Sequence, residues 1–192
     1  DIYMQKIAFG KKYEELNIDP ETPSDEIVKS FSKYSGIKIE NIVVCILDRP
    51  RHKDLINRVR STGARIKLIS DGDVSAVIAT TIEDSGVDIY MGTGGSPEGV
   101  LAAAALRCIG GKMYTKLAFE DQEQIERAKS MGIKDPKKIY ETEDLASGDV
   151  MFSATGVTNG TLLRGVLIKN EIATTHSVVM RSKTKTVRYV SA

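Results

Sequence analysis

Apolar positions in the middle of the chain follow two alternating patterns. Residues 42–47 (I-V-V-C-I-L) form a continuous apolar run, which is typical of a strand covered on both faces. Strands are also predicted at 65–70, 87–91 and 113–119, with apolar residues at helical spacing between them. Strands and helices that alternate through short connections favour right-handed crossovers and a mainly parallel sheet with helices on its faces.

The two ends of the chain differ from this middle block. Before it, residues 3–9 predict a strand and residues 24–34 a helix. After it, strands are predicted at 150–155, 162–169, 172–181 and 186–190. The turns between them, Asn159-Gly160 and Lys169-Asn170, are typical of antiparallel hairpins. We therefore predict one layered α/β domain with an antiparallel C-terminal extension.

Charge and composition argue against two classes of partner. Lys and Arg (27) nearly balance Asp and Glu (26), aromatic residues make up 6% and Trp is absent, so we expect no nucleic acid binding. No stretch approaches the ~18 apolar residues of a membrane span, so we expect no membrane contact. Cys45 and Cys108 lie in apolar stretches and predict reduced core thiols in a cytoplasmic protein.

Three loops that follow successive strands carry unusual residues. They are residues 48–52 (D-R-P-R-H), 71–73 (D-G-D) and 92–99 (G-T-G-G-S-P-E-G). In an open parallel sheet, ligands bind outside the carboxyl ends of the strands. Since consecutive parallel strands bring these loops to one edge, we predict a binding pocket there.

The first loop predicts a phosphate site. Arg49 and Arg51 stand beside a helix N-terminus, where guanidinium forks and free backbone N–H groups both suit phosphate. A solvated helix start with Pro50 near its first position remains an alternative.

The second loop predicts acceptors for sugar hydroxyls. Gly72 permits a tight turn, while Asp71 and Asp73 supply carboxylate oxygens. The alternative is structural, because Asp73 is also a good N-cap for the helix that follows.

The third loop predicts a metal ligand at a helix start. Its glycines allow backbone to approach a ligand, Ser96 is a candidate cap, and Pro97 suits the first helical position. Glu98 lies in the first turn and is a hard carboxylate ligand for Mg²⁺ or Mn²⁺, or else only stabilises the helix. One carboxylate does not make a metal site, so further ligands must come from outside this chain.

Other motifs fit less well. Residues 92–97 nearly match a dinucleotide fingerprint, with Glu120 as the candidate ribose-binding acid, but a proline replaces the third glycine. Glu98 would also repel a pyrophosphate. His52 and His176 are too few and too far apart for a zinc site, and we interpret both as non-catalytic.

Taken together, these segments resemble the class II fructose-1,6-bisphosphatases, whose relatives also hydrolyse sedoheptulose 1,7-bisphosphate. The resemblance runs nearly from end to end. The matching segments are 1–6 (D-I-Y-M-Q-K), 49–52 (R-P-R-H), 69–73 (I-S-D-G-D), 91–100 (M-G-T-G-G-S-P-E-G-V), 155–160 (T-G-V-T-N-G) and 177–182 (S-V-V-M-R-S).

The resemblance implies a fold similar to that of inositol monophosphatases, with alternating layers of helices and sheets. It also implies roles for nine residues. Tyr3 lies near the substrate phosphate; Arg49, Pro50 and Arg51 line the phosphate-binding loop; Asp71, Gly72 and Asp73 contact the sugar; Gly95 contacts the substrate; and Glu98 binds the metal.

One departure from the family is large. Its other metal ligands lie in an N-terminal half with a D-P-L-E-G-T motif, which this sequence lacks. We therefore expect residues 1–192 to be the C-terminal, sugar-phosphate-binding domain, with the missing N-terminal half as its partner and no catalytic residue of its own.

The resemblance also implies an activity for the complete enzyme. This is hydrolysis of the 1-phosphate of fructose 1,6-bisphosphate to fructose 6-phosphate, with Mg²⁺ or Mn²⁺, in cytoplasmic gluconeogenesis. We expect a homo-oligomer, and we expect this chain alone to bind sugar phosphate weakly without turning it over. A non-catalytic sugar-phosphate sensor is the alternative.

Overall fold

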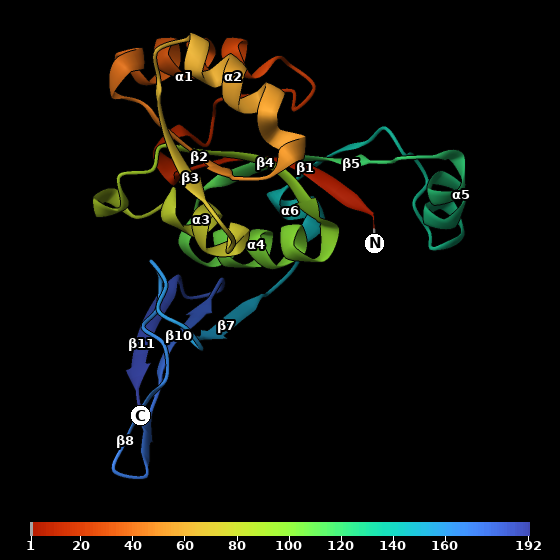
Figure 1. Ribbon diagram of the computed structural model, residues 1–192. Coiled ribbons are helices and arrows are strands. Elements are labelled where there is room, and N and C mark those ends of the chain that lie inside the picture. The colour runs from red at the N-terminus through yellow and green to blue at the C-terminus, as the bar shows by residue number, and fades with distance from the viewer. Residues whose placement is uncertain (1) are drawn as a thin grey trace.

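The computed structural model describes residues 2–192, so Asp1 of the first matching segment lies outside the described residues. Helices α1 (Ser24–Ser35) and α2 (Lys53–Ser61) cover one face of a central sheet, and α3 (Asp73–Ala79) and α4 (Ser96–Ile109) cover the other (Figure 1). A second sheet packs on the far side of α4. These alternating layers confirm the predicted α/β fold.

The central sheet has six strands in the order β3-β2-β4-β1-β5-β6. The strands are β1 (Tyr3–Phe9), β2 (Val43–Leu47), β3 (Arg65–Ile69), β4 (Ile89–Gly95), β5 (Lys112–Ala118) and β6 (Ile139–Glu141). β2 is parallel to β3 and β4, whereas β1 lies antiparallel between β4 and β5, and β6 is antiparallel to β5. Four strands, β2 to β5, therefore share one direction, and the N-terminal strand is inserted among them.

Alternation along β1 explains how the sheet holds both helical layers. Ile7 and Phe9 pack with Phe31 of α1 on one face, and Ala8 packs with Leu106 of α4 on the other. Each fully buried large apolar side chain contributes about 1.5–3 kcal/mol. Both cysteines are buried and unpaired, as predicted, and burial raises the pKa of each thiol.

The second sheet is antiparallel, with the order β11-β10-β7. Its strands are β7 (Met151–Thr155), β10 (His176–Arg181) and β11 (Thr186–Ser191). Phe152, Val178 and Met180 from this sheet form a core with Ala105 and Cys108 of α4. The predicted antiparallel extension is thus joined to the body by apolar packing.

The loops of this extension match the prediction in part. β8 (Leu167–Lys169) and β9 (Ile172–Thr174) form the hairpin predicted at Lys169-Asn170, where Asn170 has a φ of 51°. The strand predicted from residue 162 begins only at Leu167, and Asn159-Gly160 does not join two strands. The Gly160 N–H instead bonds the Leu163 carbonyl within the connecting segment.

Three elements complete the described chain. α5 (Gln122–Ser130) follows β5, and the short β6 and α6 (Thr142–Leu145) were not predicted. α3 ends at Ala79, where the Thr80 and Thr81 hydroxyls bond back to carbonyls in its last turn. Single 3₁₀ turns lie at Lys11–Tyr13, Ile39–Asn41, Pro50–His52 and Glu83–Ser85.

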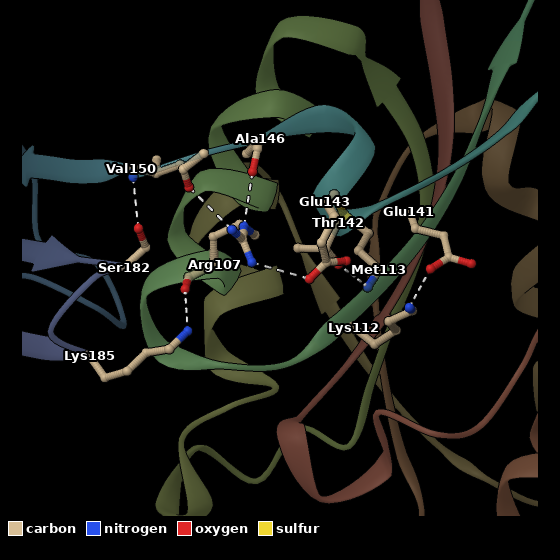
Figure 2. A network of polar contacts seen from close by, with 11 residues as sticks. Arg107, Lys112, Met113, Glu141, Thr142, Glu143, Ala146, Val150, Ser182 and Lys185 are labelled. Carbon is tan, nitrogen blue, oxygen red and sulfur yellow. Dashed lines mark hydrogen bonds and ion pairs between the residues drawn. The ribbon is translucent and has the colours of Figure 1, made fainter.

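A polar joint links α4 to the segment that leads into the second sheet (Figure 2). Arg107 donates from Nε to the Ala146 carbonyl at 3.0 Å and from Nη2 to the Gly148 carbonyl at 3.2 Å. It also pairs with Glu143 at 3.4 Å. Lys185, before β11, donates to the Arg107 carbonyl at 2.8 Å. One arginine therefore holds the path from α6 to β7.

Candidate active-site crevice

The strand order creates a switch point between β2 and β4, and we call the hollow beside it, which Arg51, His52 and residues 91–93 help to line, the crevice. The chain leaves β2 for α2 on one face of the sheet and leaves β4 for α4 on the opposite face (Figure 1). β2 and β4 pair only at Val44–Ile89 and Cys45–Tyr90, and then separate. Such a switch point at the carboxyl ends of strands is where open α/β sheets bind ligands.

Where β4 has no pairing with β2, two side chains from residues 48–52 bond its backbone instead. The Thr93 N–H donates to His52 Nε2 at 2.8 Å, and Arg51 Nε donates to the Thr93 carbonyl at 2.8 Å. His52 Nδ1 lies 2.7 Å from the Leu47 carbonyl. Because Nε2 accepts, Nδ1 carries the proton and donates to Leu47.

His52 is therefore a neutral side chain that links the end of β2 to β4, and not an acid or a base. Its ring is 2% exposed. Burial lowers its pKa, although the hydrogen bond to Leu47 opposes this, and the charge of Arg51 lowers the pKa further. Sequence reasoning gave His52 no role; its place between β2 and β4 depends on tertiary contacts.

Arg51 forms one wall of the crevice with Tyr3. Its guanidinium carbon lies 4.9 Å from the centroid of the Tyr3 ring, within the range of a cation–π contact. Within residues 2–192, no side chain or carbonyl accepts a hydrogen bond from the Arg51 Nη groups. The guanidinium group is thus held by the bond from Nε to Thr93 and by stacking on Tyr3. Its two Nη groups are free to donate to an anion.

A cavity of about 350 Å³ opens beside Arg51, between the sheet and the α1/α2 layer. Gln5, Ser24 and Thr93 contribute polar atoms to its wall. Its volume is in the range of small-ligand pockets. Arg51 is the one predicted site residue that borders it.

The glycine-rich segment lies in a strand rather than a loop, which corrects the prediction. Residues 92–95 are the end of β4 and pair with β1, Gly95 opposite Tyr3 and Gly94 opposite Met4. Gly95, not Ser96, is the N-cap of α4, and Ser96 donates to the Ile2 carbonyl at 2.6 Å. The strand continues because β1, distant in sequence, supplies its partner.

Glu98 is in contact with Gly95. The carboxylate bends back over the glycine, so a side chain at position 95 would require the Glu98 side chain to move away. Pro97 is the second helical residue, and Glu98 is exposed in the first turn of α4. Across the described part of the chain, no three His, Cys, Asp or Glu residues form a cluster that could hold a metal ion. The donor type suits Mg²⁺ or Mn²⁺, but the described residues supply one such ligand here.

Asp73 reaches the other side of the same glycine strand. It is the first residue of α3, and Gly72, with a φ of 81°, is the N-cap, so the alternative in which Asp73 caps this helix is wrong. Its Oδ2 accepts from Lys6 Nζ at 2.7 Å, and a Cβ at Gly94 would lie 3.1 Å from the same oxygen. Asp73 therefore faces Gly94 from beneath the sheet.

Lys6 is the functional candidate that sequence reasoning missed. A signal was present: in β1, Lys6 shares a face with Met4 and Ala8, so the alternation buries it. A buried lysine is rare unless it is paired.

The remaining predicted residues lie at the same edge but apart. Arg49 donates to the neighbouring Asp48 carbonyl at 2.9 Å, and Pro50 opens a 3₁₀ turn. Asp71 is exposed and borders a separate cavity of about 310 Å³ with Thr161. Among the described residues, no hydrogen bond or ion pair joins Arg49 or Asp71 to the crevice. Their roles in substrate binding stay predictions.

The geometry disfavours a dinucleotide site. In that fingerprint the glycines form the turn between strand and helix, whereas here residues 92–95 are paired strand. The Glu98 carboxylate also occupies the helix start where a pyrophosphate would bind.

A helix that crosses a membrane needs a long apolar stretch, and none of the helices within residues 2–192 has one.

Comparison with known proteins gives a consistent family. A sequence model described as "Bacterial fructose-1,6-bisphosphatase, glpX-encoded" matches residues 1–192. A protein of Trichodesmium erythraeum (strain IMS101), named D-fructose 1,6-bisphosphatase class 2/sedoheptulose 1,7-bisphosphatase, is 40% identical over 203 residues, with 99% of this chain and 59% of the relative covered. Proteins of the same name from Synechocystis sp. (strain ATCC 27184 / PCC 6803 / Kazusa) and Synechococcus sp. (strain JA-2-3B'a(2-13)) are 39% identical, with 99% of this chain and 59% and 58% of the relatives covered. The chain thus spans less than two thirds of the length of these relatives.

Proposed function

This chain belongs to the family of bacterial, glpX-encoded fructose-1,6-bisphosphatases, and from that premise we propose that it supplies the sugar-phosphate-binding half of a bisphosphatase. The complete enzyme would hydrolyse the 1-phosphate of fructose 1,6-bisphosphate to fructose 6-phosphate, in cytoplasmic gluconeogenesis. One observation carries the proposal. An arginine fork, a sugar-compatible carboxylate and a metal-compatible carboxylate surround one glycine strand, at Arg51, Asp73 and Glu98.

Arg51 and Tyr3 would bind a phosphate of the substrate. The Nη groups of Arg51 suit bidentate recognition of phosphate oxygens. Stacking on Tyr3 and the bond to Thr93 hold the fork before the ligand arrives. A pre-ordered fork loses less conformational entropy on binding.

Asp73 would accept a hydrogen bond from a sugar hydroxyl. At Gly94 and Gly95 a larger residue would contact the Asp73 or the Glu98 carboxylate. The two glycines therefore let both acids lie against the end of β4, next to the place proposed for the ligand. Arg51 and Asp73 lie on opposite faces of the sheet at the end of β4. A bisphosphate that spans this edge of the sheet would contact both residues.

Glu98 would contribute one oxygen ligand to Mg²⁺ or Mn²⁺, with the other ligands supplied by the N-terminal half of the enzyme. Such an ion activates water and neutralises charge on the phosphoryl oxygens. On this proposal Glu98 holds the metal side of the site close to Gly95, and the chain itself supplies positioning and charge complementarity.

The test is phosphate release from fructose 1,6-bisphosphate with Mn²⁺. The chain alone is compared with a fusion in which the Trichodesmium relative supplies the segment that this chain does not cover. We expect no turnover by the chain alone and clear turnover by the fusion. A Glu98→Gln fusion should lose activity while keeping substrate affinity. A fusion that binds the bisphosphate without hydrolysing it would favour the sensor alternative, and a fusion that does neither would overturn the proposal.

A further inference from the structure

Lys6 carries a buried charge beneath the candidate site. Its side chain is 1% exposed, and among residues 2–192 no other Lys, Arg, Asp or Glu is buried. Removing an ammonium group from water is costly unless a partner compensates for it. That partner is Asp73, at 2.7 Å, whose side chain is 14% exposed.

Two glycines on different elements make room for this lysine. A Cβ at Gly99 of α4 would lie 3.2 Å from Lys6 Cε and 2.6 Å from Met4 Sδ. A Cβ at Gly94 of β4 would lie 3.4 Å from Lys6 Nζ. The lysine therefore passes from β1 between β4 and α4 to reach the start of α3.

Asp73 has little else to fix its carboxylate. Apart from Lys6, its described contact is a 3.1 Å hydrogen bond from the adjacent Val74 N–H. It opens a helix of 7 residues and follows Gly72, which is in the left-handed region. A carboxylate with so few contacts of its own needs a distant partner to hold one orientation.

We propose that Lys6 is a positioning residue that holds the Asp73 carboxylate in place as the hydroxyl acceptor for the sugar. The inference rests on the proposed function and adds a residue to it. An ion pair that only ties β1 to α3 would affect every ligand of the protein in the same way. An ion pair that positions Asp73 acts on the sugar and not on the phosphate.

The experiment is calorimetric titration of this chain with fructose 1,6-bisphosphate and with inorganic phosphate. Lys6→Met removes the charge and keeps the length of the stem. We expect the bisphosphate Kd to rise about tenfold, the scale of one well-placed hydrogen bond. The inorganic phosphate Kd should stay the same, because Arg51 is untouched.

Lys112→Met is the matched control. Lys112 also forms an ion pair from a strand of the central sheet, with Glu141, and it lies at the far end of β5 from the crevice. This variant should leave both dissociation constants unchanged. Gly94→Ala gives a second route, because its methyl group would press on the pair without removing a charge. It should weaken bisphosphate binding and spare inorganic phosphate, even if Lys6→Met fails to fold.

A double variant completes the test. If Lys6 acts through Asp73, Lys6→Met/Asp73→Asn should bind the bisphosphate no more weakly than Asp73→Asn alone. Additive losses, or equal losses for both ligands, would overturn the inference. A Lys6→Met protein that binds the bisphosphate like the wild type would overturn it and leave the proposed function intact. A wild-type chain that binds neither ligand would overturn both.

Discussion

At the scale of single residues, Arg51 makes the most informative set of contacts. Its Nε bonds the Thr93 carbonyl of β4, and its guanidinium stacks on Tyr3 of β1. One side chain thus joins the loop after β2 to two other strands. Both contacts depend on the planar fork of an arginine, which a lysine does not have.

Arg51→Lys should therefore weaken phosphate binding although it keeps the charge. Loss of bidentate donation and stacking should raise the Kd for inorganic phosphate about tenfold or more. Titration calorimetry measures this. Arg60→Lys, on the exposed face of α2, is the control and should bind like the wild type. Equal affinity in Arg51→Lys and the wild type would remove Arg51 from the proposed site.

His52 gives stability a dependence on pH. Burial lowers its pKa below the 6.5 of a free imidazole, so the unfolded chain takes up a proton first as pH falls. The free energy of unfolding should decrease below about pH 6.5, by at most about 1.4 kcal/mol per pH unit, until the folded pKa is reached. Above that range this contribution is fully present.

Urea denaturation of wild type and His52→Gln at several pH values tests this. The variant should be less stable at neutral pH, since Thr93 and Leu47 lose a partner, and the difference should shrink on acidification. A constant difference between the two proteins at every pH would contradict the assignment of a neutral, buried imidazole.

At the scale of elements, the molecule depends on partners that are distant in sequence. β1 pairs with β4 as far as Gly95, so the glycines belong to the strand. Arg107 of α4 bonds the backbone of the linker between α6 and β7, which has no strand partner there (Figure 2). The linker has little apolar cover of its own, since residues 147–149 are exposed. Its position therefore depends on polar contacts, of which those of Arg107 reach Ala146 and Gly148.

Arg107→Met should destabilise the protein by about 2–3 kcal/mol, because two carbonyls and Glu143 lose a charged donor. Chemical denaturation measures the loss. Arg60→Met, which removes an exposed arginine from another helix, should change stability by less than about 0.5 kcal/mol. If both variants are equally stable, the joint is not what holds the linker.

At the scale of the whole molecule, two sheets share α4. The central sheet packs on one side of this helix and the β7–β10–β11 sheet on the other. Small residues at Ala102, Ala103 and Ala105 allow both sheets to approach. The N-terminus of the same helix carries Glu98, so the helix that unites the layers also positions the metal-compatible carboxylate.

Phe152→Ala should separate stability from site geometry. Phe152 is 7% exposed in the core between α4 and the second sheet, and its truncation should cost about 3–5 kcal/mol. Hydrogen exchange should show faster exchange in β7 and β10 than in β2 and β4. Uniform acceleration across both sheets would mean that the molecule unfolds as one unit.

The sequence by itself determined the layered α/β class, the strands and helices of the middle block, and the chemical types of the site residues. Periodicity and turn residues are local signals, so β1 was predicted with its observed bounds and β2 to within a residue. The family resemblance was also carried by local segments. The match to residues 1–192 confirms it.

Only the tertiary structure decided which of those residues meet. Insertion of β1 between β4 and β5 turned residues 92–95 from loop into strand and brought Tyr3 beside Gly95. The same insertion buried Lys6 against Asp73, whereas among the described residues Arg49 and Asp71 form no hydrogen bond or ion pair with the crevice. Strand order and side-chain pairing depend on contacts between segments far apart in the chain, and a local pattern that indicates a buried Lys6 does not identify its partner.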